Sequence, residues 1–88
     1  MSHRQIESMY FRLVEKQEET GSPCQDSPEL FYPEDFSRDV EMNVMAERIA
    51  KSLCKQCPLM LMCRDYAIAS QQMYGIWGAL SPDNRRAI

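Results

Sequence analysis

The stretch Cys54-Lys-Gln-Cys57-Pro-Leu-Met-Leu-Met-Cys63 decides the fold, because it places three of the chain's four cysteines within ten residues. The fourth, Cys24, lies thirty positions earlier. Four thiolates in this arrangement can ligate a tetrahedral metal ion or an iron-sulfur cluster, since both kinds of centre accept soft, deprotonated sulfur ligands. We therefore expect the chain to be organised around one thiolate-ligated inorganic centre.

The length of the chain makes such a centre important for stability. At 88 residues there is room for one domain, and a chain this short buries too little apolar surface to be comfortably stable by packing alone. Four cysteines offer either two disulfides or one four-ligand centre. A centre whose binding is coupled to folding would contribute on the order of 10 kcal/mol, as structural zinc does.

The N-terminus bears on the choice between these two. Residues 1–7 read Met-Ser-His-Arg-Gln-Ile-Glu, without the apolar core or cleavage site of a secretory signal, and no apolar run approaches the roughly 18 residues of a membrane span. We therefore expect a cytoplasmic protein. Thiols stay reduced in that compartment, which favours metal binding or redox chemistry over structural disulfides.

The charges are distributed unevenly within a formal net charge of -3. Residues 24–53 carry three basic against seven acidic side chains, whereas residues 54–88 carry four basic against two acidic ones. An autonomous nucleic-acid-binding protein would need clustered Lys and Arg side chains to neutralise several phosphates. The charge pattern therefore argues against such a protein and favours a basic protein partner.

Hydrophobic periodicity predicts an all-α fold, a small irregular bundle of about four short helices. The first is expected over residues 4–17, with an apolar stripe of Ile6, Met9, Tyr10, Leu13 and Val14. The second is expected over residues 39–53, with a stripe of Val40, Val44, Met45, Ile49 and Leu53. A third should run from Pro58 to about Gln72 and a fourth over residues 81–86, because serine and proline suit helix starts.

Two segments between the helices are expected to be irregular. Gly21 and Pro23 should end the first helix, so that Cys24 enters from an extended linker into an ordered loop. The aromatic side chains of that loop either cover the centre or form a contact surface for a partner: Phe31, Tyr32 and Phe36. The other segment is a tight turn, Gly75-Ile-Trp77-Gly78, whose tryptophan belongs either to the core or to the same contact surface.

Spacing alone leaves the nature of the centre open. Zinc sites usually show two close ligand pairs, whereas here only Cys54 and Cys57 form one, and Cys24 and Cys63 stand apart. A larger iron-sulfur cluster accommodates sulfurs spread over a wider perimeter. The alternatives are a structural zinc-binding adaptor, two disulfides, and a thiol-disulfide oxidoreductase using Cys54-x2-Cys57. Such an enzyme would lack the strand-helix context of a thioredoxin fold and would leave two cysteines unused.

Three sequence blocks together resemble the WhiB-like (Wbl) family of actinobacteria and their phages. The first is Cys24-x-Asp-x-Pro-Glu-Leu-Phe31-Tyr32-Pro, and the second is Cys54-x2-Cys57-Pro-x4-Cys63. The third is Gly75-Ile-Trp77-Gly78, followed by residues 81–86. The resemblance covers about residues 24–86, and the order and spacing of the blocks are far more specific than the cysteines alone.

This resemblance implies a small helical protein arranged around a 4Fe-4S cluster, whose ligands are Cys24, Cys54, Cys57 and Cys63. It implies a regulator of transcription, not an enzyme, which binds the C-terminal domain (region 4) of the primary sigma factor of RNA polymerase. The cluster would respond to oxygen or nitric oxide. The partner surface would comprise Phe31, Tyr32, Gly75, Trp77 and Gly78. Residues 24–88 would form the cluster domain, and residues 1–23 an N-terminal amphipathic helix and linker.

The chain departs from the family pattern at two places that bear on the site. Ala79 stands where the family turn usually has another glycine, and a positive φ there would cost energy. After the turn, only Arg85 and Arg86 stand where many members carry a Lys/Arg-rich tail that binds DNA. We therefore expect little or no direct DNA binding, and a monomer that forms a heterodimer with the sigma domain.

Overall fold

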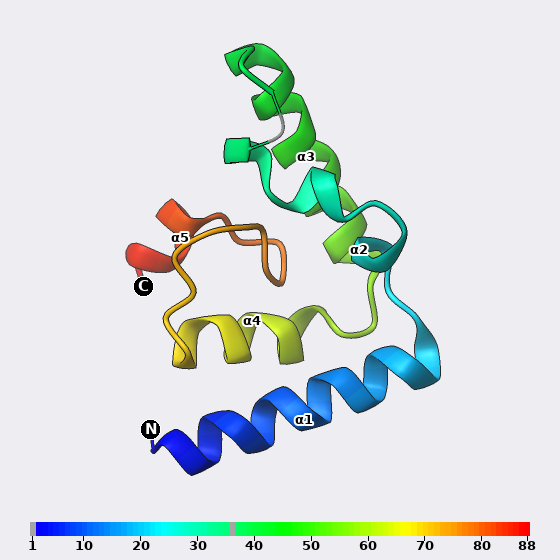
Figure 1. The fold of residues 1–88 in the computed structure, drawn as a ribbon, viewed down its shortest axis with the longest axis vertical. Helices are drawn as coiled ribbons and strands as arrows, with labels where there is room; N and C mark the ends of the chain where they lie inside the picture. The colour runs from blue at the N-terminus through cyan, green and yellow to red at the C-terminus, as the bar shows by residue number, and fades with distance from the viewer. Residues whose placement is uncertain (1, 36) are drawn as a thin grey trace.

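The computed structural model describes residues 2–35 and 37–88, so the loop aromatic Phe36 lies outside the described residues. The described residues form five α-helices and two short 3-10 helices, with no strand among them (Figure 1). In chain order these are α1 (His3–Thr20), α2 (Pro23–Asp26), η1 (Pro28–Phe31), η2 (Pro33–Asp35), α3 (Val40–Gln56), α4 (Met60–Ala69) and α5 (Pro82–Arg86). The expected all-α fold is confirmed.

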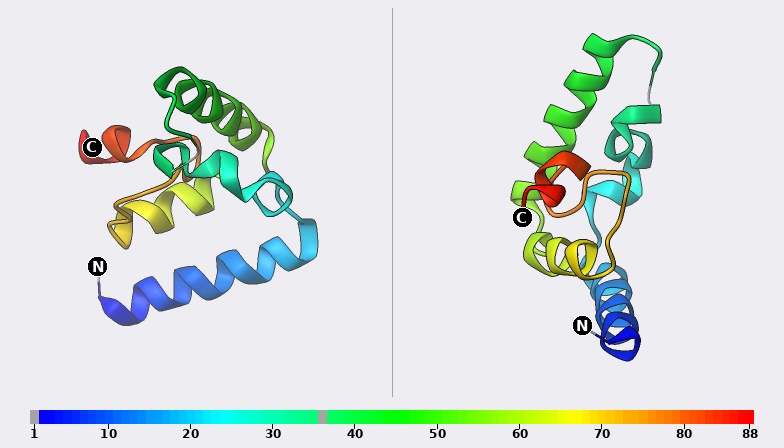
Figure 2. Two further views of the ribbon diagram at one scale, coloured as in Figure 1. Left: turned by 45° about the horizontal axis from the view of Figure 1, so that its top comes forward. Right: turned by 90° about the vertical axis from the view of Figure 1, so that its left-hand side faces the viewer.

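The helices surround one small core. Helices α1 and α4 lie side by side and antiparallel, as Figure 1 and the left view of Figure 2 show. Helix α3 rises on the other side of the molecule, with η1 and η2 packed along it. The segment between α4 and α5 runs between the α1/α4 pair and α3 (Figure 1). The buried residues of the core come from η1, α3 and this segment: Phe31, Ala50, Cys54, Ile76 and Ala79.

Helix α1 confirms the first predicted helix and extends it by one residue at its start and three at its end. The Ser2 side chain accepts a hydrogen bond from the Gln5 amide at 3.2 Å, and the Gln5 side chain accepts one from the Ser2 amide at 2.8 Å. This reciprocal pair satisfies two of the free amides at the helix start. Gly21 ends the helix with a φ of 72°. Leu13 is the buried residue of α1.

The linker predicted before Cys24 is shorter than expected: only Gly21 and Ser22 lie between the helices, and Ser22 has extended backbone. Cys24 itself lies in the one-turn helix α2, which begins at Pro23. The Gln25 side chain accepts a hydrogen bond from the Ser22 amide at 3.1 Å, and proline is pre-organised for the first helical position. The same residues that stop α1 therefore start a new turn.

Helix α3 confirms the second predicted helix but buries a different face. Its buried residues are Ala46, Ala50 and Cys54, which recur every four residues. The predicted stripe is mostly exposed, including Val40, Val44, Met45 and Ile49, and only Leu53 packs against the core. Small side chains face inward because η1, η2 and α2 pack closely against this helix. The size of the side chains, and not hydrophobicity alone, therefore determines which face of α3 is buried.

The third and fourth predicted helices are present, and the third is shorter than predicted at both ends. Helix α4 begins at Met60 instead of Pro58, which lies in a turn closed by a hydrogen bond from the Met60 amide to the Cys57 carbonyl at 3.2 Å. It ends at Ala69, before the predicted Gln72. Helix α5 begins as predicted with Pro82 after a serine cap. No helix in the described part of the chain is long and apolar enough to cross a membrane.

Candidate metal centre

All four cysteines line one cavity at the centre of the fold. Cys54 lies in the last turn of α3 and Cys57 follows that helix directly, while Cys63 lies in the first turn of α4 and Cys24 in α2. None of them forms a disulfide with another described residue. The rest of the wall is mainly apolar and includes Leu13, Phe31, Leu59, Met60 and Ile76. The structure therefore brings together four sulfurs from segments that are far apart in the sequence.

Burial and the neighbouring cysteines raise the pKa of two of these thiols, Cys54 and Cys63. Burial raises the pKa of Cys63 to about 12, and the neighbouring Cys54, Cys24 and Cys57 add to that increase. Burial likewise raises the pKa of Cys54. A thiolate in an apolar site is costly without a positive charge beside it. A cation or cluster binding here must therefore displace protons.

The donor set fits a thiolate-ligated centre in its chemistry. Four soft sulfur donors share one apolar cavity, as the ligands of zinc or of an iron-sulfur cluster do. Among the described residues, however, no three His, Cys, Asp or Glu side chains are grouped as ligands of one ion. The four sulfurs therefore line one cavity, but no three of them are arranged to bind a single ion.

Helix α1 supplies one side of this cavity, which the sequence did not predict. The Gln17 side-chain amide donates to the Ser22 hydroxyl at 3.1 Å and to the Cys24 sulfur at 3.6 Å. The Ser22 hydroxyl lies 3.2 Å from the same sulfur. Gln17 stands one turn after the buried Leu13, and that spacing is the signal that would have placed it on the inner face. Polar groups of this kind orient a sulfur ligand and tune its basicity.

The turn over residues 75–80 supplies the opposite side. Hydrogen bonding from the Gly78 backbone lowers the pKa of both Cys54 and Cys63, and hydrogen bonding from the Ala79 backbone lowers that of Cys54, so both act against burial. Amides that point at sulfur stabilise the thiolate form and affect the potential of any redox centre bound there. The predicted turn therefore belongs to the centre as well as to the surface.

Both predicted turn glycines allow a close approach of the backbone. A Cβ atom on Gly75 would lie 2.8 Å from the Tyr32 ring, and one on Gly78 would lie 2.6 Å from the Cα atom of Arg64. Both glycines have a positive φ, of 81° and 59°. Ala79 also has a positive φ, of 66°, so the strain expected from its methyl group is present.

The three candidate partner-binding aromatics occupy different environments. Phe31 is only 5% exposed and belongs to the core, whereas Tyr32 is 41% exposed. Trp77 is half-buried. Its ring centroid lies 5.8 Å from that of Tyr66, and its Nε1 atom donates to the Tyr74 carbonyl at 3.1 Å. The alternative in which the loop aromatics cover the centre therefore suits Phe31, and the alternative of a contact surface suits Tyr32.

Comparison with known proteins identifies the family to which this arrangement belongs. The family model described as transcription factor WhiB matches residues 16–88. The chain belongs to the WhiB family. The resemblance found in the three sequence blocks is thereby confirmed, and the chain is a member of a family of transcriptional regulators.

Similar family members have been described in several actinobacteria. The chain is 38% identical over 63 residues to the redox-responsive transcriptional regulator WhiB3 of Mycolicibacterium smegmatis, covering 72% of this chain and 64% of that protein. It is 36% identical over 66 residues to the transcriptional regulator WhiB1 of Bifidobacterium longum, covering 74% and 68%. The same identity and length relate it to WhiB1 of Mycobacterium tuberculosis, covering 74% and 75%. The matched stretch therefore spans about two thirds to three quarters of these relatives.

Proposed function

We propose that this family member holds a 4Fe-4S cluster and regulates transcription by binding the C-terminal domain (region 4) of the primary sigma factor. The cluster ligands would be Cys24, Cys54, Cys57 and Cys63. The observation that carries the proposal is that these four sulfurs line a single apolar cavity. When bound, the cluster would supply a redox-active centre that reacts with small diatomic molecules. The name of the Mycolicibacterium relative, which describes it as redox-responsive, supports such a role.

The chain's own residues prepare the cavity for a charged cluster. Leu59 and Met60 limit the access of water, which strengthens every electrostatic interaction inside. Backbone hydrogen bonding from Gly78 and Ala79 to the sulfurs offsets part of the cost of burying thiolates. A structural zinc-binding adaptor remains the alternative, because zinc accepts the same ligands.

The proposed partner surface lies beside the centre. Tyr32 is exposed and touches the turn at Gly75, and Trp77 is half-buried next to it along the turn. Rigid aromatic rings of this kind supply much of the energy at protein interfaces. The acidic balance of residues 24–53 complements a domain that itself binds DNA and is therefore basic. In this proposal the chain works in the cytoplasm, as a heterodimer with the sigma domain, with little or no direct contact to DNA.

Anaerobic co-expression with the sigma-factor C-terminal domain tests the proposal. We expect the two chains to purify together as a brown complex, with iron and acid-labile sulfide each approaching about four per regulator chain. A colourless protein with one zinc and no sulfide would support the adaptor instead. A brown protein that never retains the sigma domain would refute the proposed partner while leaving the cluster in place.

The sensing role has its own test. Nitric oxide or oxygen should convert the cluster to other iron species and release the segments tied to Cys24 and Cys63. The visible spectrum should change and affinity for the sigma domain should fall. Exhaustive treatment with nitric oxide that altered neither the spectrum nor the affinity would contradict a sensing function.

A further inference from the structure

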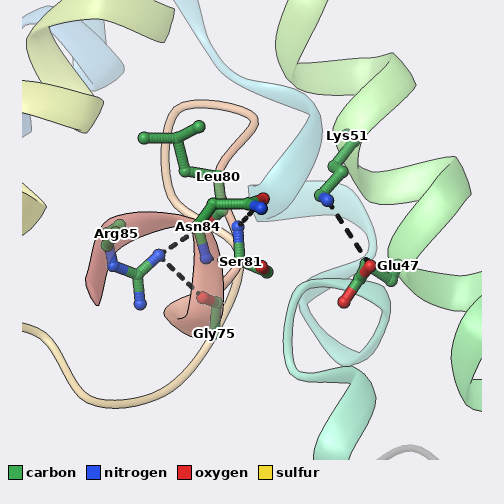
Figure 3. Close-up of polar contacts among 7 residues, drawn as sticks. All are labelled: Glu47, Lys51, Gly75, Leu80, Ser81, Asn84 and Arg85. Carbon is green, nitrogen blue, oxygen red and sulfur yellow. Dashed lines mark hydrogen bonds and ion pairs between the residues drawn. The ribbon is translucent and has the colours of Figure 1, made fainter. Parts of the chain in front are cut away.

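A buried arginine holds the turn that faces the cysteines. Arg85 is only 8% exposed, although arginine is rarely buried in small proteins. Its Nη1 atom donates to the carbonyls of Gly75 at 3.0 Å and Leu80 at 2.7 Å. Its Nη2 atom donates to those of Gln72 and Tyr74, both at 3.2 Å. Figure 3 shows the guanidinium lying between Gly75 and Leu80.

Four carbonyls from one nine-residue segment therefore converge on a single side chain. This segment makes few backbone hydrogen bonds of its own, the main pair joining Trp77 and Leu80. Its other anchors also come from outside it. The Phe31 carbonyl accepts from the Ile76 amide at 2.6 Å and the Glu34 carboxylate from the Gly75 amide at 2.8 Å, while the Arg64 side chain donates to the Gly78 carbonyl at 2.9 Å.

The buried Arg85 guanidinium lies near the Glu34 carboxylate. Burial lowers the pKa of the guanidinium, while Cys63 and Glu34 raise it. Its buried Nε atom has no hydrogen-bond partner among the described residues. Burying the guanidinium charge with its Nε donor unpaired costs free energy. Such a group is retained in a fold where it fixes a geometry that the fold requires.

We propose that Arg85 is the positioning residue of the centre: by clamping residues 72–80 it holds Gly78 against the cysteine cavity and Ala79 against Cys54, and it keeps Trp77 beside Tyr66. The two arginines after the turn thus have different roles. Arg86 is exposed and pairs with Asp83 on its own helix. This inference rests on the proposed function only in taking the cysteines as ligands, and it holds for iron or zinc.

The shape of the side chain is essential to this role. A guanidinium is a planar fork whose donors reach several carbonyls at once, whereas a lysine ammonium is a compact point charge. Lysine at position 85 would keep the charge and lose most of the four contacts. Glutamine would lose the charge as well. Comparison of Arg85→Lys with Arg85→Gln therefore separates the effect of the lost hydrogen bonds from the effect of the lost charge.

Hydrogen exchange of the anaerobically purified holoprotein tests the assignment. We would compare Arg85→Lys and Arg85→Gln with the matched controls Arg86→Lys and Arg86→Gln. In both Arg85 variants, backbone amides in the peptide covering residues 72–81 should exchange at least about tenfold faster, while peptides from α1 and α3 keep their protection. The absorption spectrum of an iron-sulfur centre should shift in the same variants, because the turn that lines its cavity moves. Both Arg86 variants should match the parent protein.

Two outcomes would overturn the proposal. One is exchange in the turn that is no faster in the Arg85 variants than in the Arg86 variants. The other is a uniform rise across the turn, α1 and α3 in Arg85→Lys, the milder change, which would make Arg85 a general stabilising residue. The exchange readout needs neither the sigma domain nor a particular metal. Failure of the proposed function would instead appear in the parent protein, as a missing cluster or missing co-purification.

Discussion

Helix α3 and the turn over residues 75–80 are held in place in different ways. Helix α3 makes its own backbone hydrogen bonds and leaves large apolar side chains such as Met45 and Ile49 in solvent. The turn has one internal backbone pair and is otherwise held from outside, by the Phe31 carbonyl and by the side chains of Glu34, Arg64 and Arg85. The difference teaches that local propensity forms the long helix, whereas tertiary anchors give the centre its shape. Substitutions at the centre and turn should therefore cost far more than those on the outer face of α3.

Loss of a cysteine should have the largest effect. Cys57→Ser should abolish the centre and with it much of the roughly 10 kcal/mol that a coupled centre contributes, because a chain of this size has no compensating core. Iron content, acid-labile sulfide and circular dichroism under anaerobic conditions measure this. Lys55→Ser, an exposed change in the same segment, should leave all three unchanged. A Cys57→Ser protein with full iron content and cooperative unfolding would show that this cysteine is not a ligand.

Two glycine substitutions should separate the cost of backbone strain from the cost of a steric clash with a neighbouring segment. Gly78 and Gly21 both have a positive φ, of 59° and 72°, but only Gly78 lies against another segment. Gly21→Ala should lower the free energy of unfolding by about 1–2 kcal/mol through strain alone, because φ 72° with ψ 167° is a conformation that residues other than glycine rarely adopt. Gly78→Ala should lower it by about 3 kcal/mol or more, since the new methyl would meet the backbone of Arg64. Anaerobic denaturation of both variants measures the difference, and equal losses would mean that the turn is loosely placed.

Replacement of the turn tryptophan should affect binding more than folding. Trp77→Ala should weaken affinity for the sigma domain by about thirtyfold, or about 2 kcal/mol, while the brown chromophore is retained. Tyr32→Ala should weaken it in the same direction. Met73→Ala, an exposed residue just before the turn, is the control and should bind normally. Loss of both cluster and solubility in Trp77→Ala would assign the ring to the core, and undiminished affinity would place the interface elsewhere.

The same comparison explains what could be predicted from the sequence. Helices α1, α3 and α5 were predictable because caps and periodicity act over neighbouring residues, as in the serine and proline that begin α5. The grouping of the cysteines followed from their spacing and from the resemblance. The clamp of Arg85 was not predictable, because in sequence it looks identical to Arg86 and differs only in what folds around it. The inner face of α3 was missed for the same reason, since packing against η1 and η2 selected alanines over larger residues.

The smallest effect is expected on the outer face of α3, where two adjacent residues offer the same substitution in opposite environments. Met45 is 59% exposed and Ala46 is 1% exposed. Met45→Gln keeps the length and helix propensity of the side chain and buries no polar group, so the free energy of unfolding should change by less than about 0.5 kcal/mol. Ala46→Gln would force a long amide into closely packed surroundings and should cost about 2 kcal/mol or more. Parallel denaturation curves measure both. A loss at Met45 as large as that at Ala46 would mean that the outer face of α3 is covered in solution, and that the contrast between helix and turn is smaller than the structure indicates.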